Sequence, residues 1–423
     1  MTGESTWFGH PRGLTILFLT NMWEQFSYYG MRALLVYYMT KQLLLEQGTS
    51  SYIYGAYTAC AYFTPLIGGI IADRALGKKR AIIIGGSVMA LGHFMMTLEP
   101  LFYVALATIA IGNGLFLPSL PSQIGDLYAP GDARAGRAYN VYYVGVNIGG
   151  FLAPLICGTL GEIYGWHWGF GAAGIGMMLG LALYLWGQPH LPTQSKPLPV
   201  ESSGAPRDGM ARDTFLLLFG LGVAVTVFRS AYEQIGNTVA LWADVGVDKQ
   251  AGGFAIPMTW FISMNPLCVM LLTPLLLAWW RKREAAGFNP TPTRRMASGA
   301  LIVGGAYLLL AALSWRAGDL AVGWQWFALF WVVLTFGELF ILPTGLGLFA
   351  RLAPRRLGAT TVASWFLASF AGSLSAGVVG TLWTRMAHPA FFTLLAAICA
   401  IAALGLRLMD GQAREIRSRL TIL

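Results

Sequence analysis

The stretch GGIIADRALGKKR, residues 68–80, places one acidic and four basic residues between two long apolar blocks at 50–72 and 81–98. Elsewhere charge is scarce: the 423 residues carry 28 basic and 19 acidic side chains, which makes 11% charged against 56% hydrophobic, and mean hydropathy is +0.59. A soluble domain has about a quarter of its residues charged, and a disordered chain is poor in aromatics, which make up 13% here. These values exclude both classes and indicate an integral membrane protein.

Long apolar blocks recur along the whole chain, and each reaches the roughly 17–25 residues that a helix needs to cross the hydrocarbon core. The predicted spans are residues 14–42, 50–72, 81–98, 101–122, 138–161, 167–187, 213–243, 253–280, 296–315, 323–350, 358–383 and 389–408. Alternating strands of about 10 residues, the pattern of a membrane β-barrel, are absent. The first block is too long for the apolar region of a cleavable signal peptide, so none is expected. The predicted fold is an all-α membrane protein with twelve transmembrane helices.

The basic residues predict the orientation of these helices. Most of the 28 lie in the even-numbered connections and at the two ends of the chain, whereas the odd-numbered connections contain only Lys41, Lys249, Arg316 and Arg385. By the positive-inside rule both termini are cytoplasmic, and an even number of spans agrees with this. The net charge of +9 is therefore a topology signal. Because the basic residues are spread over many loops, no nucleic-acid partner is expected.

The segment 188–212 divides the chain into two halves of similar hydropathy. It is rich in Pro, Ser and charge and lacks periodicity, which predicts a cytoplasmic linker between a bundle at 1–187 and a second bundle with a short tail at 213–423. The four cysteines, Cys60, Cys157, Cys268 and Cys399, fall inside spans and are expected to be free thiols. No catalytic or nucleotide-binding motif occurs in a credible context. We therefore expect a monomer with neither enzymatic activity nor a cofactor or metal.

Residues 68–80 resemble the signature of the major facilitator superfamily, in which an acid, two glycines and a basic run lie between spans 2 and 3. The resemblance implies two six-helix bundles related by a pseudo-twofold axis that rock around a midplane cavity. In this interpretation Gly69 lets two helices touch, and Asp73 pairs with a basic group or a helix N-terminus. Gly69, Asp73 and Arg74 are then a conformational latch. The alternative is an ordinary positively charged loop.

A narrower resemblance, to the proton-dependent oligopeptide transporter (POT or PTR) family, rests on several stretches. They are NMWEQFSYYGMR (21–32), GNGLFLPSLPSQIGDLY (112–128), YNVYYVGVNIGGFLAPLICGTLGEIYGWHWGFGAAGIGM (139–177), GELFILPTGL (337–346), AYEQIGNTVALWAD (231–244) and SMNPLCVMLLTPLL (263–276). Members usually carry ExxER on span 1 and a lysine on span 4. Here those positions hold Asn21, Glu24 and Gln25, and Leu117. The first acid, the arginine and the lysine are therefore missing.

The resemblance also implies where a substrate binds. Asn147, Asn265 and Glu338 match the family's pocket for the amino end of a peptide, and Glu233 matches its acid on span 7. The full set of candidate substrate-binding residues is Asn21, Gln25, Tyr28, Tyr29, Arg32, Tyr62, Asn147, Arg229, Asn265, Glu338 and Trp365. The candidates for proton coupling are Glu24, Glu233 and Glu338.

Elementary energetics single out some of these residues independently, because a charge in the bilayer core costs at least about 2.5–3.5 kcal/mol. The charged residues within predicted spans are Glu24, Arg32, Arg229, Glu233 and Glu338. The spacing of Asn21, Gln25, Tyr28 and Arg32 predicts one polar stripe facing water or substrate. Arg229 either supplies a relocated positive charge for a substrate carboxylate or neutralises Glu233, which lies four residues further along the helix.

These features predict a secondary transporter of the inner membrane for small peptides or peptide-like solutes that carry an amine. Glu338, Asn147 and Asn265 would bind the amine, and Arg32 or Arg229 a carboxylate. Because the span-1 relay is incomplete, coupling is carried either by Glu233 and Glu24 or is weakened to facilitated diffusion. Two alternatives are export of a metabolite or drug, and a receptor that binds its ligand without transport.

Overall fold

The computed structural model describes residues 5–6, 9–128, 132, 134–192, 212–288, 290–318, 320–352 and 358–415. The chain divides into two compact units. Unit 1 comprises Met1–Tyr38 and Cys60–Gly204, and unit 2 comprises Met39–Ala59 and Ala205–Leu423. Most of the predicted linker, residues 193–211, lies outside the described residues.

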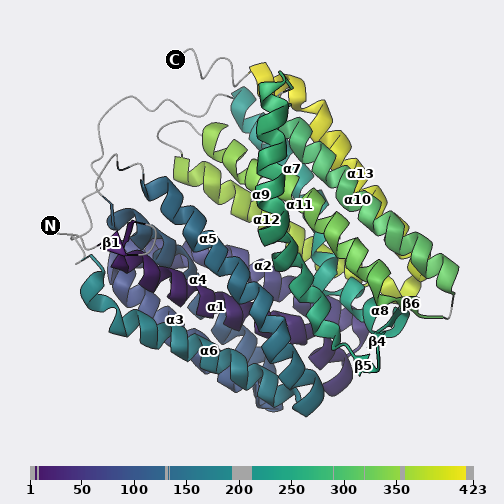
Figure 1. Cartoon of the computed structure of the whole chain (residues 1–423), viewed down its shortest axis with the longest axis horizontal. Coiled ribbons are helices and arrows are strands. Elements are labelled where there is room, and N and C mark those ends of the chain that lie inside the picture. Colours follow the sequence, from purple (N-terminus) through teal and green to yellow (C-terminus); the bar gives the residue numbers. More distant parts are fainter. Residues whose placement is uncertain are drawn as a thin grey trace. The chain divides into compact units, whose positions relative to one another are not determined.

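Unit 1 is a helical bundle. It contains the short strands β1 (Ser5–Thr6) and β2 (His10–Pro11), the helices α1 (Arg12–Tyr37), α3 (Lys78–Met95), α4 (Phe102–Asp126), α5 (Arg134–Ala153) and α6 (Trp166–Trp186), and the second part of α2 (Gln47–Ile71). Helix α1 packs against α5 and α6, and α3 packs against α4 and α6 (Figure 1). The π-helical segments Ala72–Leu76, Pro154–Gly158 and Leu160–Tyr164 extend α2 and α5.

Small residues bring the helices of unit 1 into close contact. A Cβ on Gly149 of α5 would lie 2.2 Å from the carbonyl oxygen of Met22 on α1, so only glycine fits there. A Cβ on Gly68 of α2 would lie 2.0 Å from the carbonyl oxygen of Gly114 on α4. The tight contact of α2 thus falls on Gly68 rather than on Gly69, where it was predicted. A Cβ on Gly69 would meet only the Pro118 side chain, at an ordinary 3.6 Å.

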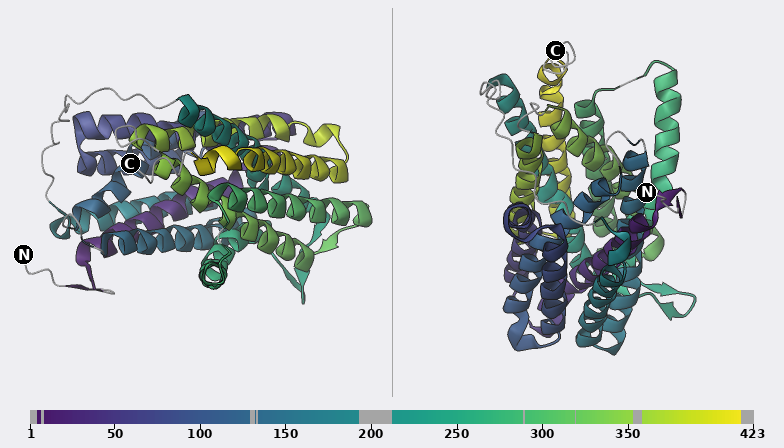
Figure 2. Two further views of the ribbon diagram at one scale, coloured as in Figure 1. Left: turned by 90° about the horizontal axis from the view of Figure 1, so that it is seen from above. Right: turned by 90° about the vertical axis from the view of Figure 1, so that its left-hand side faces the viewer.

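Unit 2 is a second helical bundle. Its helices are α7 (Arg212–Tyr232), α8 (Thr238–Gly246), α9 (Met264–Ala285), α10 (Pro292–Ala317), α11 (Trp324–Leu352), α12 (Gly358–Gly380) and α13 (His388–Leu408), and it also contains the first part of α2. Helix α10 packs against α11 and α13, and α7 against α12 and α13. Figures 1 and 2 show the α10–α13 pair in green and yellow from three directions.

The helices coincide closely with the predicted spans. By length and hydropathy, ten helical segments of the described chain qualify as membrane spans; α1 and α3 are long helices that do not meet this criterion. The span predicted at 253–280 begins too early, because residues 247–255 form the short strands β3 (Val247–Asp248), β4 (Gln250–Ala251) and β5 (Phe254–Ala255). Strand β3 pairs with β6 (Val322–Gly323), and β4 with β5. Helix α9 follows a 3-10 segment, Met258–Ser263.

Residues 39–59 pack with unit 2, although they precede most of unit 1 in the sequence. The Gln47 amide nitrogen donates to the Gly380 carbonyl at 3.1 Å and to the Ser51 hydroxyl at 2.7 Å. The Ser51 hydroxyl in turn donates to Asn237 Oδ1 at 3.1 Å. These bonds connect the beginning of α2 to the end of α12 and to the α7–α8 junction, which explains why this segment belongs to unit 2.

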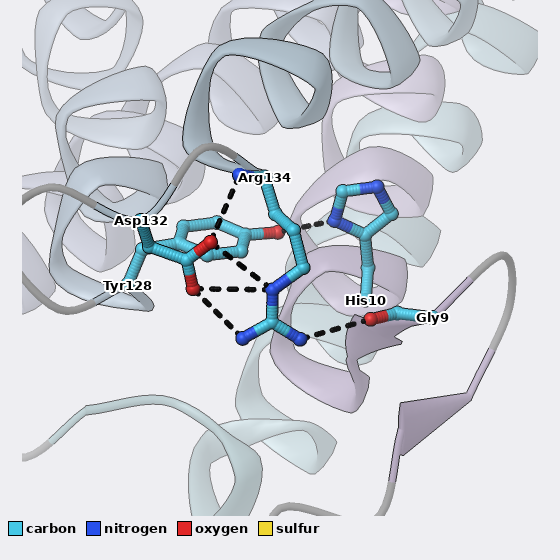
Figure 3. A network of polar contacts seen from close by, with 5 residues as sticks. All are labelled: Gly9, His10, Tyr128, Asp132 and Arg134. Carbon is cyan, nitrogen blue, oxygen red and sulfur yellow. Dashed lines mark hydrogen bonds and ion pairs between the residues drawn. The ribbon is translucent and has the colours of Figure 1, made fainter.

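A polar network fixes the N-terminal strand pair of unit 1 (Figure 3). His10 Nδ1 lies 2.7 Å from the Tyr128 hydroxyl at the end of α4. Arg134, the first residue of α5, forms a 2.7 Å ion pair with Asp132 and donates to the Gly9 carbonyl at 3.1 Å. The described part of the α4–α5 connection is therefore attached to the segment that leads into α1.

This network makes unit 1 sensitive to acid. Burial, together with the guanidinium groups of Arg137 and Arg134, lowers the pKa of His10 below its ordinary 6.5, and Asp132 opposes the shift. Since the folded state favours the neutral imidazole, its stabilisation is complete above pH 6.5 and is lost as the pH falls below that value. We expect a His10→Phe variant to show a smaller drop in thermal midpoint between pH 7.5 and 5.5 than the wild type. An equal drop in both proteins would contradict a role for His10.

Candidate functional site

Glu338 on α11 is at the centre of a buried polar cluster in unit 2, with 8% of its surface exposed. The Asn265 amide donates to Glu338 Oε2 at 2.6 Å and to the Thr335 hydroxyl at 3.1 Å. The Tyr232 hydroxyl, from the last residue of α7, also hydrogen-bonds the Glu338 carboxylate. Two helices, α7 and α9, thus orient this carboxylate of α11 through donors. A carboxylate has about four acceptor positions, so it can accept further donors, such as those of an ammonium group.

Arg229 and Glu233 form an ion pair beside this cluster. Both side chains are buried, and the Arg229 guanidinium donates to Glu233 Oε1. Their spacing on one face of a helix was predicted, and the pairing is confirmed. Arg229 and Glu233 also lie close enough to Glu338 to act on it electrostatically, with opposite signs. Two acids and one arginine therefore share this part of unit 2.

The local backbone explains how these side chains come together. Helix α7 ends at Tyr232, and Glu233–Gly236 continues as a 3-10 segment. The Tyr307 hydroxyl of α10 donates to the Ala231 carbonyl at 2.7 Å, immediately before this change. Gln234 donates to the Ala376 carbonyl of α12 at 2.8 Å. The segment that carries Tyr232 and Glu233 is therefore held by α10 and α12.

Trp365, a candidate from the sequence, packs against α11 instead of joining this cluster. Its ring meets that of Phe349 edge to face, with centroids 5.4 Å apart. Gly345 also lies directly against the Trp365 ring. Trp365 is buried in unit 2, and its described contacts are with Phe349 and Gly345 of α11.

Unit 1 contains a second buried polar cluster, around Glu24 of α1. Only 1% of the Glu24 surface is exposed, and the Gln25 amide donates to Glu24 Oε2 at 2.6 Å. Tyr142 of α5 lies within electrostatic range of Glu24. The Asn21 amide donates to the Tyr142 carbonyl at 3.3 Å. Among the residues that the structure describes, Glu24 has no ion-pair partner.

The predicted polar stripe of α1 is therefore partly internal. Asn21 and Gln25 are buried in the bundle, which corrects the expectation that the whole stripe faces water or substrate. Tyr28 and Arg32, further along α1, are half-buried. The rings of Tyr28 and Tyr29 meet edge to face, with centroids 5.4 Å apart.

Two further candidates of unit 1 lie on other helices. Asn147 is buried on α5, and its amide donates to the Tyr143 carbonyl one turn earlier at 2.9 Å. Tyr62 is half-buried on α2. The candidates thus fall into two groups, one in each unit, and the described contacts within each unit place Glu24 in one group and Glu338 in the other.

Comparison with known proteins identifies the family. The sequence pattern of the POT family, PTR2, matches residues 79–202 and 207–394. This chain belongs to the POT family. It is 30% identical to the peptide transporter YePEPT of Yersinia enterocolitica subsp. palearctica, with 89% of each chain covered. It is 31% identical to a di-/tripeptide transporter of Lactococcus lactis subsp. cremoris, covering 86% of this chain and 88% of the relative.

Solved structures agree with this assignment. A crystal structure of a mutant peptide transporter POT in complex with alafosfalin matches with a TM-score of 0.88 and 28% identity, over 98% of this chain and 96% of that one. The predicted fold, an all-α membrane protein of the major facilitator type, is thereby confirmed. The protein is a multi-pass membrane protein.

The predicted latch of this POT-family chain is exposed. Asp73 and Arg74 lie in the π-helical segment Ala72–Leu76, and within the described part of the chain neither forms an ion pair. At the same end of unit 1, Lys78 pairs with Asp126 at 2.7 Å and also donates to the Ser122 carbonyl. Lys78 thus adds an ion pair between the start of α3 and the end of α4, and the latch role of Asp73 stays a prediction.

Sequence reasoning missed several partners. Tyr232 and Thr335 complete the cluster around Glu338, yet they are separated in sequence from the residues that they contact. Asp244, which pairs with Lys41 at 2.5 Å and with Lys249 at 3.1 Å, was also missed. Lys41, Asp244 and Lys249 all lie in unit 2, because unit 2 includes the segment 39–59 that contains Lys41. Lys41 and Lys249 are two of the only four basic residues that the sequence places in the odd-numbered connections, and both pair with Asp244. The scarcity of basic residues there was the sequence signal for this cluster.

Proposed function

We propose that this POT-family protein is a secondary transporter of small peptides or peptide-like solutes with a free amino group. The observation that carries the proposal is the Glu338 carboxylate, oriented by donors from Asn265 and Tyr232 in a buried site. An ammonium group is the complementary ligand, because it supplies donors and opposite charge. The similarity to peptide transporters and to a structure with bound alafosfalin supports the same substrate class.

The proposed carboxylate ligands are Arg32 in unit 1 and Arg229 in unit 2. Because Arg229 already pairs with Glu233, a substrate carboxylate bound there would exchange one buried ion pair for another. Arg32 lies on α1, where Tyr28 and Tyr29, together with Tyr62 of α2, would supply neutral hydrogen bonds. Asn147 is proposed to assist Glu338 in holding the amine.

The arrangement in the membrane is also proposed. The distribution of basic residues supports a protein of the inner membrane with both termini cytoplasmic, working as a monomer without a nucleic-acid partner. Residues 1–187 and 213–423 would be the two bundles of the transport cycle, joined by 188–212. The contacts of residues 39–59 with unit 2 would have to break and form again during alternating access.

Coupling to protons is proposed to follow an altered route, since the ExxER pattern of the family is degenerate in this chain. Glu24 is buried and its carboxylate is held by the neutral amide of Gln25, so a proton can bind there without first displacing an ion-pair partner. Glu233, in contrast, must release Arg229 before it can be protonated. This difference favours Glu24 as the coupling acid. The alternative is a facilitator or exporter that moves its substrate without protons.

Uptake into proteoliposomes tests the proposal. One proton driven by 100 mV supplies about 2.3 kcal/mol, enough for roughly fiftyfold accumulation. We expect wild-type protein to accumulate a dipeptide when the outside is acidic, and Glu24→Gln to lose accumulation while it retains exchange of labelled for unlabelled dipeptide.

The matched variant Glu233→Gln separates the two acids. Accumulation that survives Glu24→Gln and fails in Glu233→Gln would transfer the coupling role to Glu233. Wild-type flux that stops at equal concentrations would establish a facilitator. Binding of dipeptide with no flux at all would establish a receptor and overturn the transport proposal.

A further inference from the structure

The indole N–H of Trp331, on α11 of unit 2, is a buried hydrogen-bond donor. Only 1% of the Trp331 surface is exposed. Among the residues that the structure describes, no group accepts a hydrogen bond from the indole nitrogen. A buried N–H without an acceptor costs free energy, and native proteins keep few of them. The function of this donor therefore calls for an explanation.

The immediate surroundings of Trp331 are aromatic. Its ring meets those of Phe327 and Phe330 edge to face, with centroids 6.1 and 5.7 Å apart. Phe330 in turn packs against Tyr307 of α10, with centroids 6.0 Å apart. These rings hold the indole in place, but an aromatic ring is only a weak acceptor for an N–H group. The packing around Trp331 thus fixes the position of the donor without satisfying it.

Trp331 lies on the same face of α11 as Glu338. Thr335 follows Trp331 by four residues and Glu338 follows it by seven. At about 3.6 residues per turn, the three positions fall within about 60° around the helix. The Asn265 amide donates to both Thr335 and Glu338, so this face of α11 is turned toward the proposed amine site. Trp331 extends the same face by two turns toward the beginning of the helix.

The spacing of Trp331 and Glu338 corresponds to the length of a tripeptide. Seven residues of helix rise about 10.5 Å. An extended peptide spans about 3.3–3.6 Å per residue, so a tripeptide reaches about 10 Å and a dipeptide about 7 Å. If the ammonium group binds at Glu338, the carboxylate of a tripeptide reaches the level of Trp331, whereas a dipeptide ends about one residue short.

We propose that Trp331 is a further substrate-binding residue, whose indole N–H donates to the carboxylate of a tripeptide. This inference rests on the proposed function, because it takes Glu338 as the site of the ammonium group. A carboxylate has about four acceptor positions, so the bond to Trp331 leaves positions for Arg32 or Arg229. Trp331 then favours tripeptides over dipeptides, whereas Glu338 serves both.

Alternating access brings the substrate to Trp331. On the proposed orientation α11 begins at the outer side, so Trp331 lies nearer to the outside than Glu338 does. Both residues are buried in this structure. A transporter opens its two sides in turn around a fixed site, and the tripeptide meets this face of α11 when the outer side is open. Its carboxylate then supplies the acceptor that the indole N–H does not find among the described residues.

Two variants remove the donor and differ in how much packing they lose. Trp331→Phe removes the N–H together with part of the ring. Trp331→benzothienylalanine, introduced as an unnatural amino acid, replaces only the N–H by sulfur and keeps the ring size, so it serves if Trp331→Phe does not fold. The matched control is Trp242→Phe on α8. Trp242 is 3% exposed, and its ring also meets Phe327 edge to face at 6.1 Å.

The measurement is isothermal calorimetry of the purified full chain with dialanine and with trialanine. We expect both Trp331 variants to bind trialanine at least about tenfold more weakly than the wild type, the factor for one hydrogen bond to a charged group. Their affinity for dialanine should be unchanged. Trp242→Phe should bind both peptides as the wild type does.

The possible failures can be told apart. If the folded Trp331 variants bind trialanine with wild-type affinity, Trp331 does not contact the substrate, and the proposed function is unaffected. An equal loss of affinity for both peptides would show that Trp331 acts through packing or a buried water, and would overturn its role in reading peptide length. A wild type that binds neither peptide would overturn the proposed function, and the role of Trp331 with it.

Discussion

Replacing Glu338 by glutamine is expected to weaken binding of a dipeptide by roughly ten- to hundredfold. The change keeps the size of the side chain and its contact with Asn265 while it removes the charge that faces the ammonium group. A hydrogen bond to a charged group contributes about 1.5–3 kcal/mol, which corresponds to this range of affinity. Isothermal calorimetry with purified protein measures the effect.

The N-acetyl derivative of the same dipeptide is the control for Glu338. It has no ammonium group, so its affinity should change little between wild type and Glu338→Gln. If both ligands lose affinity equally, the substitution has damaged the site as a whole, and Glu338 does not recognise the amine. Asn265→Ala should weaken the free dipeptide in the same direction, because it removes the donor that orients the carboxylate.

Breaking the Arg229–Glu233 pair should destabilise the protein strongly. Both groups are buried, so Arg229→Ala leaves the Glu233 carboxylate without its counter-ion, and loss of one partner of such a pair costs about 3–5 kcal/mol. We expect a correspondingly large fall in the thermal midpoint of the detergent-solubilised protein. The double variant Arg229→Met, Glu233→Gln removes both charges and should recover most of the stability, since no buried charge remains.

Arg229→Lys distinguishes a structural from a substrate-binding role. It retains the charge but not the planar fork of the guanidinium group, so stability should be largely preserved. If Arg229 also binds the substrate carboxylate, the lysine variant should bind a dipeptide more weakly while its affinity for the C-terminal amide stays the same. If Arg229→Lys binds both ligands with the affinity of the wild type, the role of Arg229 is only to neutralise Glu233.

The stability prediction has its own contradicting outcome. If the double variant Arg229→Met, Glu233→Gln is no more stable than Arg229→Ala, the buried ion pair does not explain the loss of stability.

The helices could be predicted from sequence because burial in lipid demands long apolar segments, and these can be read directly from the chain. The prediction failed where tertiary contacts decide. The span predicted at 253–280 should begin at residue 253, yet Phe254–Ala255 form the short strand β5, and helix α9 begins only at Met264. The grouping of residues 39–59 with unit 2 depends on the bonds of Gln47 and Ser51 to residues more than 180 positions away.

The contacts of the candidate site residues could likewise be predicted from sequence only where the residues are close together in the chain. The pairing of Arg229 with Glu233 follows from helical spacing, so sequence alone predicts it. The contact of Asn265 with Glu338 was implied only by resemblance to the POT family, because the two residues lie 73 positions apart on different helices. Tyr232 was not predicted at all: the aromatic side chain at the end of α7 gives no sign in sequence that its hydroxyl reaches the Glu338 carboxylate.

Glu338 and Asn265 of unit 2 are proposed to recognise the free amino group of the substrate. The most direct measurement compares the affinities of a dipeptide, its C-terminal amide and its N-acetyl derivative for the wild-type protein. We expect the dipeptide and its amide, which both keep the ammonium group, to bind at least about tenfold more tightly than the acetylated form. Tighter binding of the acetylated form than of the free dipeptide would contradict the assignment of Glu338 and Asn265 to the amine.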